Sequence, residues 1–139
     1  MTTIVYRSGV LAADRQATSG GIRNKCTKLF RANGYAIGVS GGLAFGLAFV
    51  RWFKGGRDSP CPLDEDTYAL VMDIETGECE QWESPGIGIP IEQEYESIGT
   101  GASVAYGALT MGADARQAVK VASKWDVYTG LGVQVIKAK

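Results

Sequence analysis

Residues 2–15 read TTIVYRSGVLAADR, and this stretch decides how the chain is expected to fold. Residues 3–6 and 10–13 are short runs of β-branched and apolar side chains, which favour extended backbone. Arg7-Ser8-Gly9 lies between them and predicts a tight turn. The chain is therefore expected to begin inside a sheet, with Asp14 at the end of its second strand.

Two later segments predict further antiparallel strands. Residues 26–30 and 35–39 flank Asn33-Gly34, which is one of the strongest short hairpin signals. Residues 67–74 and 78–82 likewise flank a Glu-Thr-Gly turn. Each pair is expected to form a hairpin.

The remaining short segments are two loops and two strands. Residues 18–21 and 84–90 are rich in glycine or proline, so both are expected to be irregular. Residues 94–98 predict a brief strand, and residues 133–136 predict the last strand of the chain.

Helical spacing of apolar residues appears in three places. Residues 43–53 predict a helix that ends at Gly55-Gly56, and residues 103–111 and 114–125 predict two more, the last with Asp114 as N-cap. The order is strands, helix, strands, two helices, strand. This order predicts an α+β fold with two antiparallel sheets covered by helices.

Composition bounds the classes of protein that this chain can belong to. Its 139 residues, 45% of them apolar, suit one globular domain over residues 1–139. The net charge is -1, and the sequence has no block of basic residues that could bind along a phosphate backbone. Nucleic acid is therefore not an expected partner. No apolar run is long enough for a secretory signal or a membrane span, so we expect a cytoplasmic protein with no membrane contact.

The chain contains no histidine, which limits the chemistry available to it. Catalysis by Ser-His-Asp or Cys-His groups is excluded, and the commonest metal ligand is missing. Cys26, Cys61 and Cys79 are widely spaced and predict neither a disulfide framework nor a zinc site. We expect no metal and no cofactor, and a hydrolase built from this chain needs another base.

Thr2 offers such a base. A small residue after Met1 generally permits removal of the methionine, which leaves a threonine with a free α-amine. The ordinary pKa of an α-amine is about 7.7–8, so the amine can accept the proton of the hydroxyl on the same residue near neutral pH. Many chains begin Met-Thr, so the neighbouring sequence has to carry the interpretation.

The opening stretch closely resembles the start of proteasome β-subunits and of the bacterial HslV peptidase. Those families begin the mature chain with Thr-Thr and place an aspartate at the end of the second strand, where Asp14 stands here. The likeness continues in register through four later motifs. They are Cys26-Thr27-Lys28, Gly38-Val39-Ser40-Gly41-Gly42, Gly99-Thr100-Gly101 and Asp126-Val127-Tyr128-Thr129-Gly130.

The resemblance implies the Ntn-hydrolase αββα sandwich, in which two antiparallel sheets lie between helical layers. Here one helical layer is expected to be reduced, because residues 55–66 form a short Pro and Gly loop where the family has a second long helix. That helix normally packs against neighbouring subunits. A homo-oligomeric ring is expected, but a single ring, a smaller oligomer and a divergent assembly all stay open.

The resemblance assigns catalytic roles to seven residues. Thr2 is the nucleophile, Lys28 places its ammonium beside the hydroxyl, and Asp14 pairs with that lysine. Gly41 supplies a backbone N–H to the oxyanion at the junction of a strand and a helix, where unpaired N–H groups favour negative charge.

The other three catalytic residues are polar and are expected around the amine of the nucleophile. Thr100, Asp126 and Thr129 match the family's cluster there, although the family usually has serine in place of both threonines. The family's primary specificity pocket maps to uncharged residues, which favours cleavage after apolar side chains. Its predicted lining is Ala17, Cys26, Val39, Leu43 and Leu47.

The leading hypothesis is a threonine-type endopeptidase subunit that acts on peptides or unfolded proteins and works with an ATP-dependent unfoldase. Two alternatives stay open. One is an Ntn amidohydrolase that acts on a small amide, and the other is a non-catalytic structural homologue of a proteasome subunit.

Overall fold

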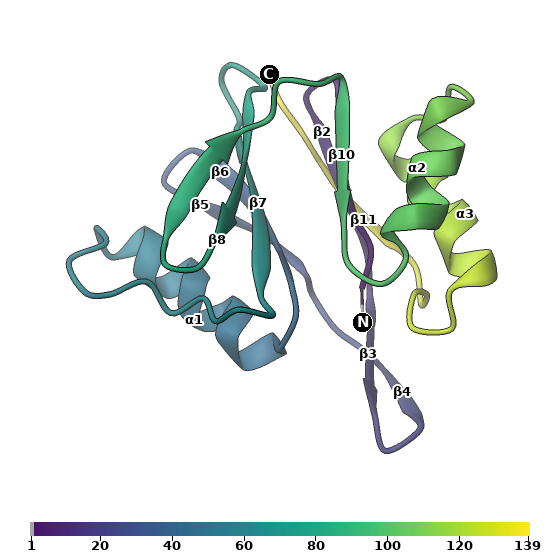
Figure 1. Cartoon of the computed structure of the whole chain (residues 1–139), viewed down its shortest axis with the longest axis horizontal. Coiled ribbons are helices and arrows are strands. Elements are labelled where there is room, and N and C mark those ends of the chain that lie inside the picture. Colours follow the sequence, from purple (N-terminus) through teal and green to yellow (C-terminus); the bar gives the residue numbers. More distant parts are fainter. Residues whose placement is uncertain (1) are drawn as a thin grey trace.

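The computed structural model describes residues 2–139 and has an α+β architecture. Two antiparallel sheets face each other, with helices on both outer sides (Figure 1). One sheet has four strands in the order β10-β1-β2-β11. These are β1 (Ile4–Arg7), β2 (Val10–Asp14), β10 (Tyr95–Ile98) and β11 (Val133–Lys137).

The facing sheet has five strands that follow one another in chain order. They are β5 (Leu29–Ala32), β6 (Tyr35–Ser40), β7 (Tyr68–Asp73), β8 (Cys79–Glu83) and β9 (Ile87–Pro90). Buried side chains from both sheets, including Ile4, Leu11, Leu70 and Met72, form a core between them. The predicted hairpins at residues 26–39 and 67–82 are confirmed within a few residues at each end.

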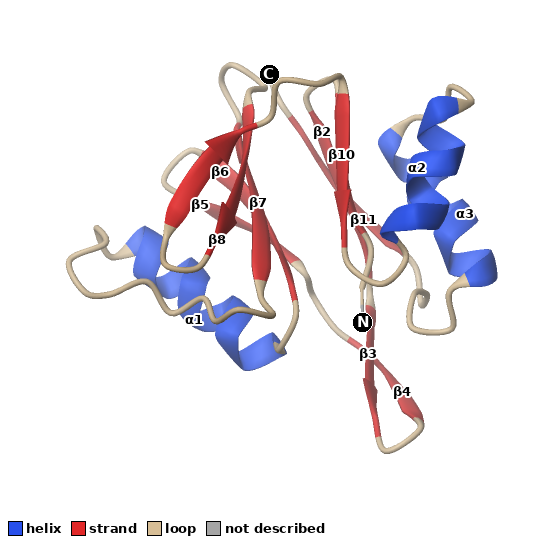
Figure 2. Ribbon diagram, viewed as in Figure 1, coloured by secondary structure: helices blue, strands red, loops and turns tan. Residues whose placement is uncertain are grey.

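Helices cover the outer faces of the two sheets (Figure 2). Helix α1 (Leu43–Lys54) packs Phe49 and Phe53 onto the five-stranded sheet. Helices α2 (Ala102–Thr110) and α3 (Ala115–Trp125) cover the four-stranded sheet through small side chains such as Ala105 on α2 and Ala118 on α3. One side therefore has a single helix, and residues 55–66 form a loop, as predicted from the sequence.

A third sheet is a correction to the predicted fold. Residues 18–21, which we expected to be a loop, belong to a hairpin of β3 (Gln16–Ser19) and β4 (Ile22–Lys25) that projects from the body of the protein (Figure 1). Gly20 and Gly21 form its turn with φ of +57° and +76°. Every residue of β4 is exposed, so the strand has no apolar alternation by which it could be recognised.

The prediction of irregular structure at residues 84–90 is also wrong in part. Residues 87–90 form β9, the edge strand beside β8. Pro90 is compatible with this place because an edge strand leaves one side of its backbone unpaired. Gly88 and Pro90 have low intrinsic strand preference, and the pairing of β9 with β8 overrides it.

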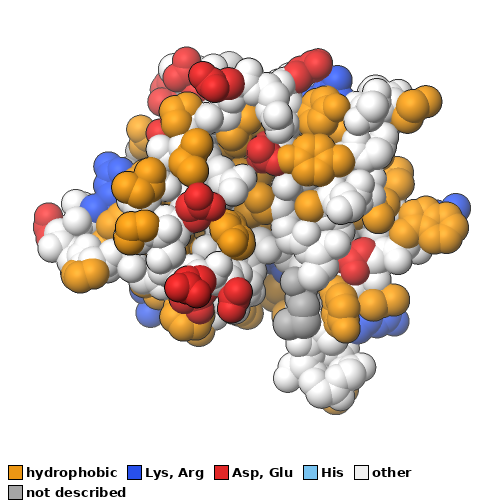
Figure 3. All heavy atoms as spheres, in the orientation of Figure 1, with side chains coloured by type: hydrophobic (Ala, Val, Ile, Leu, Met, Phe, Trp, Pro, Cys, Tyr) orange, Lys and Arg blue, Asp and Glu red, His pale blue; other side chains and the backbone are white. Residues whose placement is uncertain are grey.

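The surface of the protein mixes hydrophobic and charged side chains. Acidic groups lie scattered among hydrophobic ones on the face shown in Figure 3. Large apolar side chains that are exposed include Met111, Trp125 and Val127, at 88%, 70% and 75% of their area. Among residues 2–139, no helix is both long enough and apolar enough to span a bilayer.

Candidate active site

Asp14 is the centre of the polar site at the end of β2. The residue is fully buried, and its Oδ1 atom accepts three hydrogen bonds. The donors are the Thr2 hydroxyl at 3.0 Å, the Thr3 backbone N–H at 3.0 Å and the Lys28 ammonium at 2.8 Å. The predicted nucleophile and the predicted lysine therefore contact the same carboxylate oxygen.

The second oxygen of Asp14 fixes the surrounding backbone. Asp14 Oδ2 accepts the N–H of Gln16 at 3.1 Å and the N–H of Gly130 at 3.0 Å. A buried carboxylate is costly unless it is paired and hydrogen-bonded, and Asp14 has both a cation and several N–H donors. The orientation of this carboxylate is consequently fixed by the fold.

Lys28 lies just before β5 and reaches Asp14 from the facing sheet. It is 5% exposed, and the backbone around it is held by Gln134 on β11. Gln134 Oε1 accepts the Lys28 N–H at 2.7 Å. The buried ion pair therefore joins the two sheets. This packing brings Gln134 next to Lys28, although the two residues are 106 positions apart in sequence.

The backbone nitrogen of Thr2 begins a second series of hydrogen bonds. It donates to Thr100 Oγ1 at 3.2 Å, and Thr100 in turn donates to Asp126 Oδ2 at 2.7 Å. Thr129 donates to the same Asp126 oxygen at 2.6 Å and contacts the Thr3 hydroxyl at 2.8 Å. The three residues predicted to surround the nitrogen of Thr2 are therefore together.

The electrostatics of Asp126 follow from these contacts. Partial burial raises the pKa of the Asp126 carboxyl, but hydrogen bonds from the Thr129 and Thr100 hydroxyls outweigh it, so the pKa lies below its ordinary value. Asp126 is ionised at neutral pH as a result. A negative charge there favours a positive charge on a nearby amine.

A cavity of about 130 Å³ opens beside Thr2. Thr2, Lys28 and Gly41 line it together with all five predicted specificity residues, which are Ala17, Cys26, Val39, Leu43 and Leu47. Burial raises the pKa of the Cys26 thiol, which favours the neutral form. The wall is therefore mostly apolar and uncharged apart from Lys28.

Gly41 lines this cavity and lies between β6 and α1 in the chain. Its φ is +122°, and a Cβ built on it would stand 2.9 Å from the carbonyl oxygen of Asp66 and from Thr67 Oγ1. Only glycine fits such a position without strain. The neighbouring Gly42 is the N-cap of α1, and as a glycine it has no side chain to accept from the first N–H groups of that helix.

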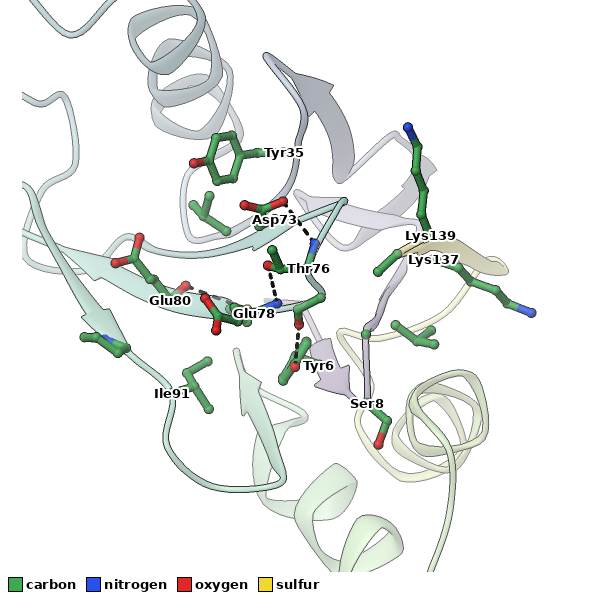
Figure 4. Close-up of a pocket in the computed structure, with 17 residues that line it drawn as sticks. Tyr6, Ser8, Tyr35, Asp73, Thr76, Glu78, Glu80, Ile91, Lys137 and Lys139 are labelled. Atoms are coloured by element: carbon green, nitrogen blue, oxygen red, sulfur yellow. Dashed lines mark hydrogen bonds between the residues drawn. The ribbon is translucent and has the colours of Figure 1, made fainter.

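A larger hollow, of about 900 Å³, lies at the other end of the sheets (Figure 4). The predicted site residues do not line it. Its polar groups stabilise a turn, since Asp73 Oδ1 accepts the N–H groups of Glu75 and Thr76, and the Tyr6 hydroxyl donates to the Gly77 carbonyl. The groups with catalytic potential gather at Thr2 instead.

Four residues join the site without having been predicted for it. Thr3, Gln16, Gly130 and Gln134 all make hydrogen bonds within it. Gly130 belongs to a quoted motif, but nothing in the sequence singles out Gln16 or Gln134. In the described part of the chain, no three His, Cys, Asp or Glu side chains gather as a metal site requires. The prediction that Met1 is removed concerns a residue outside the part of the chain that the structure describes.

Comparison with known proteins identifies the fold. No sequence profile of a known protein family matches the chain, and no curated protein matches it. Two solved structures of BPH from Thiobacillus denitrificans align over 99% of this chain and 98% of theirs, each with a TM-score of 0.75. Identity is 17% to the structure described as a complex with epoxomicin and 18% to the other. The chain therefore shares the fold of BPH over almost its whole length.

Proposed function

We propose that this chain is a proteasome-like Ntn hydrolase whose nucleophile is Thr2, acting as a threonine-type endopeptidase. One observation carries the proposal. The Thr2 hydroxyl and the Lys28 ammonium converge on a buried Asp14 at the edge of a mostly apolar cavity. BPH supports the proposal, because one of its structures contains epoxomicin, an inhibitor of proteasomes.

The proposed reaction is acyl transfer to the Thr2 hydroxyl. With Met1 removed, the free α-amine takes the hydroxyl proton while Thr2 Oγ1 bonds to the carbonyl carbon of the scissile peptide. The ammonium then gives that proton to the leaving nitrogen as the C–N bond breaks, and an ester remains on Thr2. Water, deprotonated by the same amine, attacks the ester carbon. The ester C–O bond then breaks, the ammonium returns the proton to Thr2 Oγ1, and the acyl part of the peptide leaves as a carboxylic acid.

Lys28 and Gly41 are proposed to stabilise the charges that form. The Lys28 ammonium and the Thr2 hydroxyl both donate to Asp14 Oδ1. We propose that the positive charge of the ammonium stabilises the alkoxide that forms at Thr2. The Gly41 N–H, at the start of α1, is the proposed donor to the oxyanion. Removal of one such donor commonly costs about 10²–10³ in kcat.

Thr100, Asp126 and Thr129 are proposed to orient the amine. The Thr100 hydroxyl accepts a hydrogen bond from the Thr2 nitrogen and donates one to Asp126 Oδ2. Threonine supplies here the hydroxyl that serine supplies in proteasomes. The ionised Asp126 raises the proton affinity of the amine, which suits a base that works near neutral pH.

The size of the cavity favours recognition of one side chain. Its volume of about 130 Å³ is well below the roughly 300–1,000 Å³ of a site for a whole small molecule. A peptide that lies across the surface and inserts one apolar side chain fits better than an enclosed small amide. We therefore propose peptides or unfolded proteins as substrates, cleaved after apolar residues.

The proposed assembly is a homo-oligomeric ring of single-domain, cytoplasmic subunits, with an ATP-dependent unfoldase as a further partner. Trp125 and Val127, on either side of Asp126 in the chain, are exposed apolar side chains, and we propose that subunit contacts cover them. The single helix α1 on its sheet leaves less surface for ring-to-ring packing than two helices offer. Analytical ultracentrifugation of the purified protein measures the ring size.

Substitution of Thr2 tests the proposed function. Thr2→Ala is expected to lower the hydrolysis of a fluorogenic peptide by at least about 10³-fold, because the attacking oxygen is lost. Thr2→Ser keeps the oxygen and is expected to retain activity. Thr110→Ala, an exposed threonine at the end of α2, is the matched control. Unchanged hydrolysis by Thr2→Ala overturns the proposal.

A further inference from the structure

Gln16, the first residue of β3, is buried beside the site and has no role in the proposed chemistry. It is 1% exposed, and its side-chain nitrogen donates to the Val127 carbonyl at 2.9 Å and to Thr18 Oγ1 at 3.0 Å. Both amide hydrogens are therefore used. Val127 follows Asp126 directly, so this bond holds the loop that carries the amine-orienting carboxylate.

The oxygen of the Gln16 amide is buried and has no hydrogen-bond partner among the described residues. Such an atom is costly to bury, so its position needs a reason. Rotation of the amide by 180° would set this oxygen against the Val127 carbonyl, and two acceptors would then face each other. The carbonyl of Val127 therefore fixes the amide in the orientation that leaves Oε1 unpaired.

The unpaired oxygen faces Gly130. A Cβ at Gly130 would lie 2.8 Å from Gln16 Oε1, closer than real Cβ atoms come to an oxygen, so glycine makes room for the amide. Gly130 also donates its N–H to Asp14 Oδ2, the oxygen that accepts the Gln16 N–H. Gln16 thus holds the loop of residues 126–130 at one end through Val127, and at the other end it packs on the glycine that contacts Asp14.

We infer that Gln16 is a positioning residue that locks the 126–130 loop against Asp14 and thereby sets the orientation of the Thr2 amine. The inference rests on the proposed function for its catalytic consequence. The charged groups that face Thr2 are Asp126 through Thr100, Asp14 on β2 and Lys28 before β5. Of these three, only Asp126 lies on the loop that Gln16 holds, so loss of the lock is expected to move the Asp126 charge, while Asp14 keeps its bond from the Lys28 ammonium through Oδ1.

Gln16→Met tests the lock, because methionine has a similar length but no donor for the Val127 carbonyl. We expect kcat for a fluorogenic peptide to fall by about 10- to 100-fold, as for other small displacements of catalytic groups. The acid limb of the pH profile is expected to move to lower pH, because an amine farther from the Asp126 carboxylate is less basic. Gln93→Met, at an exposed glutamine, is the matched control and should leave both unchanged.

A second substitution reaches the same contact from the other side. Gly130→Ala places a methyl group against Gln16 Oε1 and is expected to reproduce both effects of Gln16→Met. In a Gln16→Ala background the oxygen is gone, so Gly130→Ala is expected to add less than threefold to the loss. Purely additive losses would contradict the contact.

Amide hydrogen exchange tests the lock without any assay of activity. In Gln16→Met the amides of Thr129 and Gly130 are expected to exchange at least about tenfold faster than in the parent, while those of β6 stay protected. The inference is overturned if both amides exchange in Gln16→Met at the parent's rates, or if the acid limb of its pH profile does not move. If the parent protein cleaves no peptide, the proposed function fails, and exchange alone decides whether Gln16 locks the loop.

Discussion

Asp14→Asn is the substitution whose effect follows most directly from the structure. The side chain keeps its shape but loses its charge and one acceptor oxygen. Whichever way the new amide turns, its NH₂ group faces donors. On one side these are the Thr2 hydroxyl, the Thr3 N–H and the Lys28 ammonium, and on the other the N–H groups of Gln16 and Gly130.

The expected loss of stability is about 3–5 kcal/mol, the usual result of removing one partner of a buried ion pair. Asp14 is fully buried and Lys28 is 5% exposed, so water cannot compensate either group. A domain of this size is stable by about 5–15 kcal/mol, so the variant loses a large share of its margin. Lys28→Met is expected to cost less, because Asp14 keeps its other donors.

Urea denaturation followed by circular dichroism measures these differences. Asp58→Asn, an exposed aspartate in the loop after α1, is the matched control and should stay within about 0.5 kcal/mol of the parent. A loss below about 1 kcal/mol for Asp14→Asn would refute the reasoning, since the carboxylate would then not be holding a buried cation.

Three further predictions concern single residues of the site. Gly41→Ala is expected to destabilise the fold by at least about 1 kcal/mol in urea denaturation and to reduce peptide hydrolysis, because φ is +122° there and a Cβ meets the Asp66 carbonyl. Gly107→Ala, in open space on α2, should instead stabilise by up to about 1 kcal/mol. Ala17→Leu partly fills the cavity, so KM should rise about tenfold for peptides with a large apolar residue before the scissile bond and little for those with alanine; equal effects on both peptides would count against the pocket. Asp126 has a lowered pKa in the folded protein, so it contributes stability above its ordinary pKa of 3.8 and loses it as pH falls through the folded value. Acid titration of stability should therefore be shallower below pH 3.8 in Asp126→Asn than in the parent, and identical curves would contradict this.

Much of the fold could be predicted because local signals agreed with tertiary packing. The two hairpins at residues 26–39 and 67–82 and the three helices have apolar patterns of the correct period, and the structure contains all of them. The β3–β4 hairpin and strand β9 were missed for a shared reason. One has a fully exposed strand and the other contains glycine and proline, so backbone pairing and not side-chain burial defines them.

Site residues that belong to a sequence motif could be predicted. Site residues that only the fold brings together could not. Thr2, Asp14 and Lys28 follow from quoted motifs, and the structure places them in contact. Gln16 and Gln134 make their decisive contacts across 111 and 106 residues of sequence, to Val127 and Lys28. No local pattern reports such contacts, because they depend on how the two sheets and the loop after α3 are packed.

The central claim is that one threonine supplies both the attacking oxygen and the base. It is tested most directly by peptide hydrolysis with two homogeneous preparations that both begin at Thr2, one with a free α-amine and one with that amine acetylated, each verified by intact mass. We predict turnover by the first and a loss of at least about 10²-fold in the second, the lower bound for a general base. Equal turnover by both preparations would contradict the account.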